Sequence, residues 1–111
     1  NQSYAQDRTL QWDENTDPDL DGYKVYYGLE SRYPANQNPY NASGSPIDVA
    51  LGEDENPADP SIFEYTVTGL LDNEVYFFAV TAIDTDSLES GFSNEEMTLG
   101  IRWPGGGLLR E

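Results

Sequence analysis

The sequence predicts an all-β protein, folded as a single two-layer β-sandwich, and three observations lead to this expectation. Apolar and polar residues alternate with a period of two in several short runs, as they do in strands with one buried face. β-branched and aromatic residues concentrate in these runs, whereas Asp, Asn, Gly and Pro fill the stretches between them. No run shows the 3.6-residue periodicity of a helix. Several short strands separated by turn residues are typical of a sandwich.

The alternation predicts the strands in chain order and the side chains that each strand buries. In the first strand Leu10 and Trp12 share one face, and in the fifth strand Phe77, Ala79 and Thr81 point outward. The predicted strands cover residues 8–12, 22–28, 45–51, 63–70, 75–83 and 95–103. The predicted core consists of Trp12, Tyr23, Val25, Tyr65, Val67, Leu70, Tyr76, Phe78 and Val80.

Three stretches of this pattern carry a more specific resemblance. Residues 10–28, 65–84 and 89–95 resemble strands B to C, E to F and the start of G of a bacterial fibronectin type III domain. Leu70 stands six residues before Tyr76, which is the spacing of the tyrosine corner in such sandwiches. The resemblance implies a fibronectin type III, immunoglobulin-like β-sandwich.

The resemblance also divides the chain into three parts. We expect an N-terminal arm over residues 1–7, the sandwich over residues 8–100 and a C-terminal extension over residues 101–111. Seven polar residues are too few to supply the family's first strand, strand A, and its turn. The sandwich is therefore expected to be incomplete without a donated strand, with the strand at residues 8–12 as an open edge.

The chain is strongly acidic, and its charge and composition exclude several classes of function. The net charge is −16, so phosphate repulsion argues against nucleic acid as a partner. No apolar run is long enough for membrane insertion. Histidine and cysteine are both absent, which removes the usual general base and the thiol nucleophile. We expect a protein that is not an enzyme.

Two Asp-rich loops form a candidate calcium site. Asp17 and Asp19 lie between the first two strands, and Asp84 and Asp86 follow the fifth strand. In the family these loops share one pole of the sandwich, and carboxylate oxygens are ligands that Ca²⁺ prefers. A solvated acidic loop without metal is the alternative interpretation. No other cofactor is expected.

Two further features concern the surface. Asn1 and Asn41 begin Asn-x-Ser sequences that match the N-glycosylation pattern. Tyr26 and Phe77 are expected on the outer face of neighbouring strands, where they form an apolar patch. An interface with another chain and a cover supplied by the chain's own tail are the two interpretations of this patch.

The C-terminal extension carries apolar residues that an ordinary linker lacks. Ile101, Trp103, Leu108 and Leu109 flank a Gly triplet at residues 105–107, and Tyr4 gives the N-terminal arm a similar anchor. Either segment is a candidate donor for the open edge. Return of the extension to the edge of its own domain would give a closed monomer. It is expected to be geometrically possible but awkward, because the last strand and the open edge belong to different sheets.

Donation to the next copy is therefore the leading hypothesis. It predicts a homopolymer, an extracellular or cell-surface fibre or pilus-like filament joined head to tail. The alternative is an accessory adhesion or carbohydrate-associated module, or a spacer, of a larger cell-surface or secreted protein. Glycans are the partner expected on that alternative.

Overall fold

The protein is an all-β sandwich, as the alternation of its residues predicts. The computed structural model describes residues 5–71, 74–98 and 107–108. Their elements are β1 (Ala5–Asp13), β2 (Leu20–Gly28), β3 (Ile47–Ala50), a 3₁₀ turn η1 (Leu51–Glu53), β4 (Ile62–Leu71), β5 (Phe77–Asp84), β6 (Glu96–Met97) and β7 (Gly107–Leu108). Within these residues no helix is long and apolar enough to cross a membrane.

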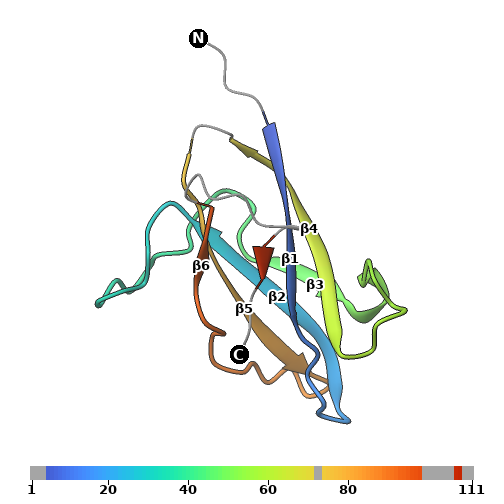
Figure 1. Cartoon of the computed structure of the whole chain (residues 1–111). Helices are drawn as coiled ribbons and strands as arrows, with labels where there is room; N and C mark the ends of the chain where they lie inside the picture. The colour runs from blue at the N-terminus through green and yellow to red at the C-terminus, as the bar shows by residue number, and fades with distance from the viewer. Residues whose placement is uncertain (1–4, 72–73, 99–106, 109–111) are drawn as a thin grey trace.

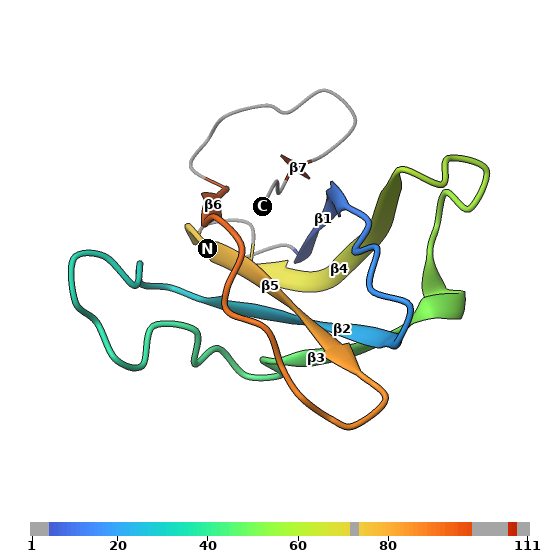
Figure 2. The same ribbon diagram turned by 90° about the horizontal axis from the view of Figure 1, so that it is seen from below.

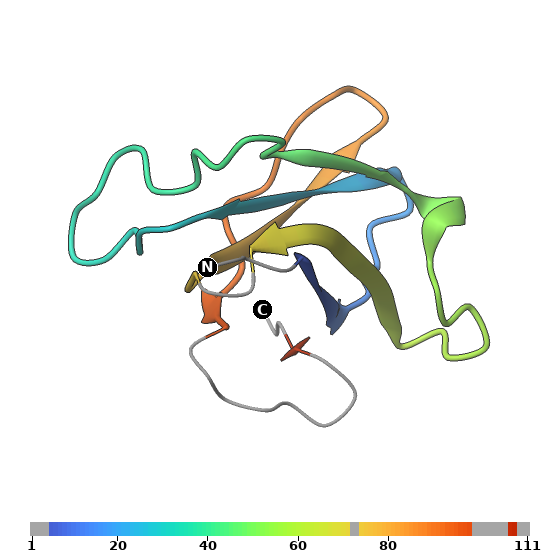
Figure 3. The same cartoon turned by 90° about the horizontal axis from the view of Figure 1, so that it is seen from above.

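The strands form two sheets that face each other (Figure 1). One has the order β4-β1-β7 and the other has the order β3-β2-β5-β6. The neighbouring strands are antiparallel, except that β7 runs parallel to β1. Figures 2 and 3 show β1 and β4 on one side of the core, with β2, β3 and β5 on the other.

The core lies between the two sheets and matches the predicted set closely. Tyr65 is half-buried and packs against the core. The other eight predicted residues are buried, and Leu10 and Phe63 join them. Burial of these large apolar side chains from both sheets is the main force that holds the layers together.

Two strand boundaries differ most from the expectation. β1 begins at Ala5, three residues before the predicted start of the first strand at residue 8 and within the predicted N-terminal arm. β6 is limited to Glu96–Met97, whereas a strand over residues 95–103 was expected. Residues 99–106 lie outside the described part of the chain.

The segment beside β5 explains why β6 is so short. Three residues of this segment each make two hydrogen bonds to a single partner in or next to β5. The backbone N–H of the residue donates to the partner's carbonyl, and its hydroxyl oxygen accepts the partner's N–H. The pairs are Ser90 with Ala82, Ser93 with Val80 and Thr98 with Tyr76. Ser93, for example, bonds Val80 in both directions at 2.8 and 2.9 Å. Side-chain hydroxyls thus take the place of backbone carbonyls as acceptors for the N–H groups along the edge of β5. The segment can therefore pair with β5 without keeping the backbone geometry of a strand.

The long β2–β3 connection folds back onto the end of β2. Ala42 donates its N–H to the Tyr27 carbonyl at 3.2 Å, and the Ser45 hydroxyl accepts the Tyr27 N–H at 2.9 Å. The loop passes so close to Gly28 that a Cβ there would stand 2.3 Å from the Pro39 carbonyl oxygen. Glycine at this position permits the loop to lie against the sheet.

Candidate functional site

The edge of β1 is the first candidate site, because the sequence predicts that this edge needs a partner strand. β4 pairs with one side of β1 along its whole length, from Ala5 to Asp13. On the other side β7 pairs with β1 in parallel, with Leu10 opposite Gly107 and Gln11 opposite Leu108. The C-terminal extension therefore reaches the predicted open edge within one chain, by the return that was expected to be possible but awkward.

Two residues of β1 close to this ladder are completely buried. Leu10 and Trp12 have no exposed surface, so they are better covered than an open groove between the sheets would allow. The Trp12 ring stacks on Phe63 and meets Tyr23 edge to face. Its indole Nε1 is buried and has no hydrogen-bond partner among the described residues. The Trp12 side chain is therefore held by its ring contacts with Phe63 and Tyr23.

The ladder between β1 and β7 is short compared with the edge that it covers. Within the described residues it pairs two positions of β1, whereas β1 is nine residues long. Strand edges with unpaired N–H and C=O groups are templates for further pairing. A longer donated strand would gain additional ladder hydrogen bonds along the same edge.

The two Asp-rich loops meet at one pole of the sandwich, as predicted. The Thr85 N–H donates to the Asp19 carbonyl at 2.9 Å, which joins the β1–β2 loop to the β5–β6 segment. Asp17 accepts the N–H of Asp19 at 2.9 Å, and Asp84 accepts the N–H of Asp86 at 2.8 Å. These carboxylates therefore stabilise their own turns, which is a common role of aspartate.

The calcium site remains a prediction. In the described part of the chain no group of three or more Asp, Glu, His or Cys side chains is arranged to hold a metal ion. Asp17 and Asp84 already accept backbone hydrogen bonds through one carboxylate oxygen. A bound ion would have to use the remaining oxygens of these side chains.

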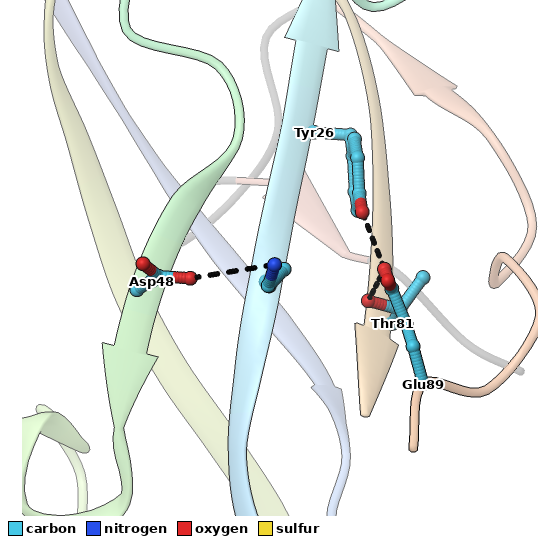
Figure 4. A network of polar contacts seen from close by, with 5 residues as sticks. Tyr26, Asp48, Thr81 and Glu89 are labelled. Carbon is cyan, nitrogen blue, oxygen red and sulfur yellow. Dashed lines mark hydrogen bonds and ion pairs between the residues drawn. The ribbon is translucent and has the colours of Figure 1, made fainter. Parts of the chain in front are cut away.

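Tyr26 lies on the outer face of the four-stranded sheet, as predicted, and its hydroxyl is engaged (Figure 4). It donates a hydrogen bond to the carboxylate of Glu89, which also accepts the Thr81 hydroxyl at 2.7 Å. On the same face Lys24 pairs with Asp48 at 3.9 Å. Burial and the bond to Glu89 raise the pKa of Tyr26 to about 12.

The same network lowers the pKa of Glu89. Burial alone would raise the pKa of Glu89. The hydrogen bonds from Tyr26 and Thr81 and the charge of Lys24 together outweigh burial, so the pKa of Glu89 lies below its ordinary value of 4.5. Ionised Glu89 is thus the form that the folded protein favours.

The ring of Tyr26 belongs to an aromatic cluster that the sequence did not predict. Tyr26, Tyr40 and Phe92 meet with centroid separations of 5.0 to 6.3 Å. Tyr40 is buried, whereas 46% of Phe92 is exposed. Phe77 is half-buried and pairs with Met97 across the β5–β6 ladder. The chain's own β2–β3 loop and β5–β6 segment therefore cover much of the face on which an open Tyr26–Phe77 patch was expected.

This cover also corrects the expectation for the outer side of β5. Ala79 and Thr81 lie on the outer face, yet both are buried, at 0% and 2% exposed. Alternation identifies which face of a sheet a side chain occupies, but it does not reveal whether a loop covers that face.

The remaining predicted residues divide between exposed and undescribed positions. Asn41 is exposed in the β2–β3 loop, and its glycosylation stays a prediction. Leu108 contributes to β7 through its backbone. Asn1, Tyr4, Ile101, Trp103 and Leu109 lie outside the described residues.

Comparison with protein-family models, curated proteins and solved structures returns no match for this chain. The class of protein is therefore defined by the sheets themselves: an all-β protein whose two layers of mainly antiparallel strands form a sandwich. Its particular features are the β1–β7 ladder and the aromatic cluster on the opposite sheet.

Proposed function

We propose that this chain is a non-enzymatic structural subunit of an extracellular fibre, in which the C-terminal segment of one copy completes the β4–β1 sheet of the next. The single observation that supports this proposal most is the ladder of Gly107–Leu108 with β1. It identifies the extension as a segment able to pair with the β1 edge. The same ladder can form within one chain or between two, as in domain swapping.

The register of this ladder favours a longer donor strand than the two residues paired within one chain. If the pairing of Leu10 with Gly107 continues, Leu109 falls opposite Trp12 and Arg110 falls opposite Asp13. Partners in a parallel ladder share a face, so Leu109 would join the buried side and Arg110 the solvent side. Leu109 would then bury its apolar side chain, and Arg110 would place a positive charge beside Asp13. Both features suit a strand at this edge.

Charge also supports exchange between copies. Residues 101–111 contain two arginines and one glutamate, whereas residues 1–100 contain three cations and twenty acidic residues. The extension is thus positive and the body of the next copy is strongly negative. Such complementarity speeds association and favours a head-to-tail contact over contact between two acidic bodies.

The tyrosine corner supports the family resemblance on which the strand assignment rests. The Leu71 N–H donates to the Tyr76 hydroxyl at 3.1 Å, a bond from a residue a few positions upstream. We propose on this basis a fibronectin type III-like sandwich in which β1 occupies the place of strand B. β7 then occupies the place of strand A, although it runs in the opposite direction to the family's strand A, which pairs antiparallel.

Deletion of residues 103–111 tests the proposal. The account predicts that the full chain assembles, as seen by light scattering, and that the shortened chain is monomeric with a lower Tm. A free peptide of residues 101–111 should raise that Tm. The same peptide with both Gly107→Pro and Leu108→Pro, which has no N–H at either ladder position, should not. Equal Tm values for both chains and a monomeric full chain would contradict the proposal.

A further inference from the structure

A hollow of about 610 Å³ opens on the outer face of the four-stranded sheet, far from the β1 edge in the topology. Its aromatic lining is the cluster of Tyr26, Tyr40 and Phe92. Tyr26 comes from β2, Tyr40 from the β2–β3 loop and Phe92 from the β5–β6 segment. The volume is in the range of small-molecule binding sites, which are usually built from aromatic side chains and a few polar groups.

The polar lining of this hollow is unusual for so acidic a chain. Four residues with carboxamide side chains line it, namely Asn36, Gln37, Asn38 and Asn41 of the same loop. The Asn36 carboxamide already donates to Glu30 and accepts the Asn38 N–H, so Gln37, Asn38 and Asn41 are the three that a ligand would use. Arg32 is the one charged residue among the described lining residues, and no carboxylate is among them. Because the chain carries 21 acidic residues, the hollow is an amide-rich region with one lining cation within an acidic surface.

We propose that this hollow binds a neutral saccharide. A carboxamide presents a donor and an acceptor side by side, which matches neighbouring sugar hydroxyls that both donate and accept. The exposed part of Phe92 offers an apolar ring surface to the C–H face of a sugar ring. The net charge of −16 disfavours anionic saccharides. No carboxylate is among the described residues that line the hollow, so these residues offer no direct ion pair to a cationic ligand.

Hydrogen bonds hold the walls of the hollow in place before any ligand arrives. The Arg32 guanidinium donates to the Tyr40 hydroxyl at 2.9 Å and to the Ser93 carbonyl at 2.8 Å, and it lies 5.4 Å from the Phe92 ring centre. The Glu95 carboxylate accepts hydrogen bonds from the Tyr40 hydroxyl at 2.5 Å and from the backbone N–H of Arg32 at 3.0 Å. A site fixed in this way loses less entropy on binding.

The saccharide has two possible sources that share this chemistry. It is either a separate molecule, or a glycan attached to Asn41, which begins the Asn41-Ala42-Ser43 sequence and also lines the hollow. Production in a host without N-glycosylation leaves the hollow free for a separate ligand. Ser43→Ala removes the glycosylation pattern and keeps the Asn41 carboxamide. Comparing this variant with the parent chain, both from a glycosylating host, isolates the attached glycan.

The test is an NMR titration of the unglycosylated full chain with maltohexaose, cellohexaose and N-acetylchitohexaose. The proposal predicts saturable shifts of the Phe92, Asn38 and Asn41 amides with at least one of these probes. The proposal would be overturned by shifts with an anionic oligogalacturonate alone. It would also be overturned if none of the three probes causes shifts and the chain from the glycosylating host does not differ from its Ser43→Ala variant. If only the chain from the glycosylating host shows shifts of these amides relative to its Ser43→Ala variant, the attached glycan is the ligand and a separate saccharide is excluded.

Variants with intact folding make the test specific. Phe92→Ala should weaken binding roughly fivefold to tenfold, because it removes the exposed ring. Asn38→Ala, at an exposed loop position, should also weaken binding and should not change Tm. Leu88→Ala is the matched control, since Leu88 is an exposed apolar residue of the same segment outside the hollow. If Leu88→Ala weakened saccharide binding as much as Phe92→Ala, this would contradict the hollow as the binding site. The strand-donation proposal is independent of these outcomes.

Discussion

Trp12 of β1 stacks on Phe63 of β4, its partner in the antiparallel ladder, with ring centres 5.2 Å apart and an interplanar angle of 15°. Both rings are fully buried. The pair connects the ladder of the three-stranded sheet to the core, because Tyr23 of the opposite sheet contacts both rings. The stability of the sandwich should therefore depend strongly on Trp12.

Trp12→Ala should lower the free energy of unfolding by about 3–5 kcal/mol, as large core truncations do. Trp12→Phe should cost less, about 1–2 kcal/mol, because it keeps a ring against Phe63 and removes an indole N–H that has no partner among the described residues. Denaturant titration measures both values. Leu29→Ala, at an exposed position, is the control and should stay within about 0.5 kcal/mol of the parent chain. Equal costs for the two Trp12 variants would contradict this account.

Tyr76→Phe tests the tyrosine corner. The Tyr76 hydroxyl accepts the Leu71 N–H at 3.1 Å, and removing the hydroxyl leaves that part-buried donor without this acceptor. The free energy of unfolding should fall by about 1–2 kcal/mol. Tyr33→Phe, at a position 61% exposed, is the matched control and should have a smaller effect. A neutral Tyr76→Phe would show that the corner bond does not stabilise the fold.

Ser93→Ala tests the hydroxyl groups that satisfy the edge of β5. The Ser93 hydroxyl oxygen accepts the Val80 N–H at a buried position, so its removal should cost about 1–3 kcal/mol. Ser93→Thr keeps the hydroxyl and should restore part of the loss. Hydrogen exchange of the Val80 amide provides the local measurement, and faster exchange is expected in Ser93→Ala alone. Unchanged exchange would mean that another group accepts this N–H.

The network around Glu89 predicts a dependence of stability on pH. Since folding lowers the pKa of Glu89, ionised Glu89 stabilises the folded protein above the ordinary value of 4.5. This contribution is lost as the pH falls through the lower pKa of the folded state. Glu89→Gln should therefore destabilise the protein at pH 7, and its difference from the parent chain should shrink below about pH 4.5 in thermal melts. A difference that is constant from pH 7 to pH 3 would exclude this role.

Much of the sandwich could be predicted because strands that bury one face leave a period-two pattern. Trp12, Val25 and Phe78 are examples of core residues that the pattern identifies directly. The adjacency of the two Asp-rich loops was also predicted, from the family resemblance, and the bond from Thr85 to Asp19 confirms it.

The outer hollow could not be predicted in the same way. Arg32, Tyr40 and Phe92 lie in irregular segments, where no periodicity links a residue to a face. Their meeting depends on how the β2–β3 loop folds back over Gly28, which is a tertiary contact. The one local signal was the concentration of Asn and aromatic residues in residues 33–41.

The path of the C-terminal extension was also beyond the sequence pattern. Alternation marks residues able to form a strand, but it does not identify the edge that the strand joins or its direction. The parallel ladder between Gln11 and Leu108 connects residues close to opposite ends of the chain. It is the relationship on which the proposed assembly depends.

The absence of cysteine from the chain allows this ladder to be examined with single cross-links. Gln11 and Leu108 are register partners, so cysteines at these two positions should form a disulfide, whether the ladder lies within one chain or between two. Gln6→Cys combined with Leu108→Cys is the out-of-register control and should remain reduced. Oxidation of each single variant alone gives the background of accidental dimers.

The most direct test of strand donation is to refold Gln11→Cys and Leu108→Cys proteins together, oxidise the mixture and identify the cross-linked peptides by mass spectrometry. The account predicts a disulfide between position 11 of one chain and position 108 of the other, well above the background of the single variants. The contradictory result is a mixture that stays uncrosslinked while the double variant closes its disulfide within single chains.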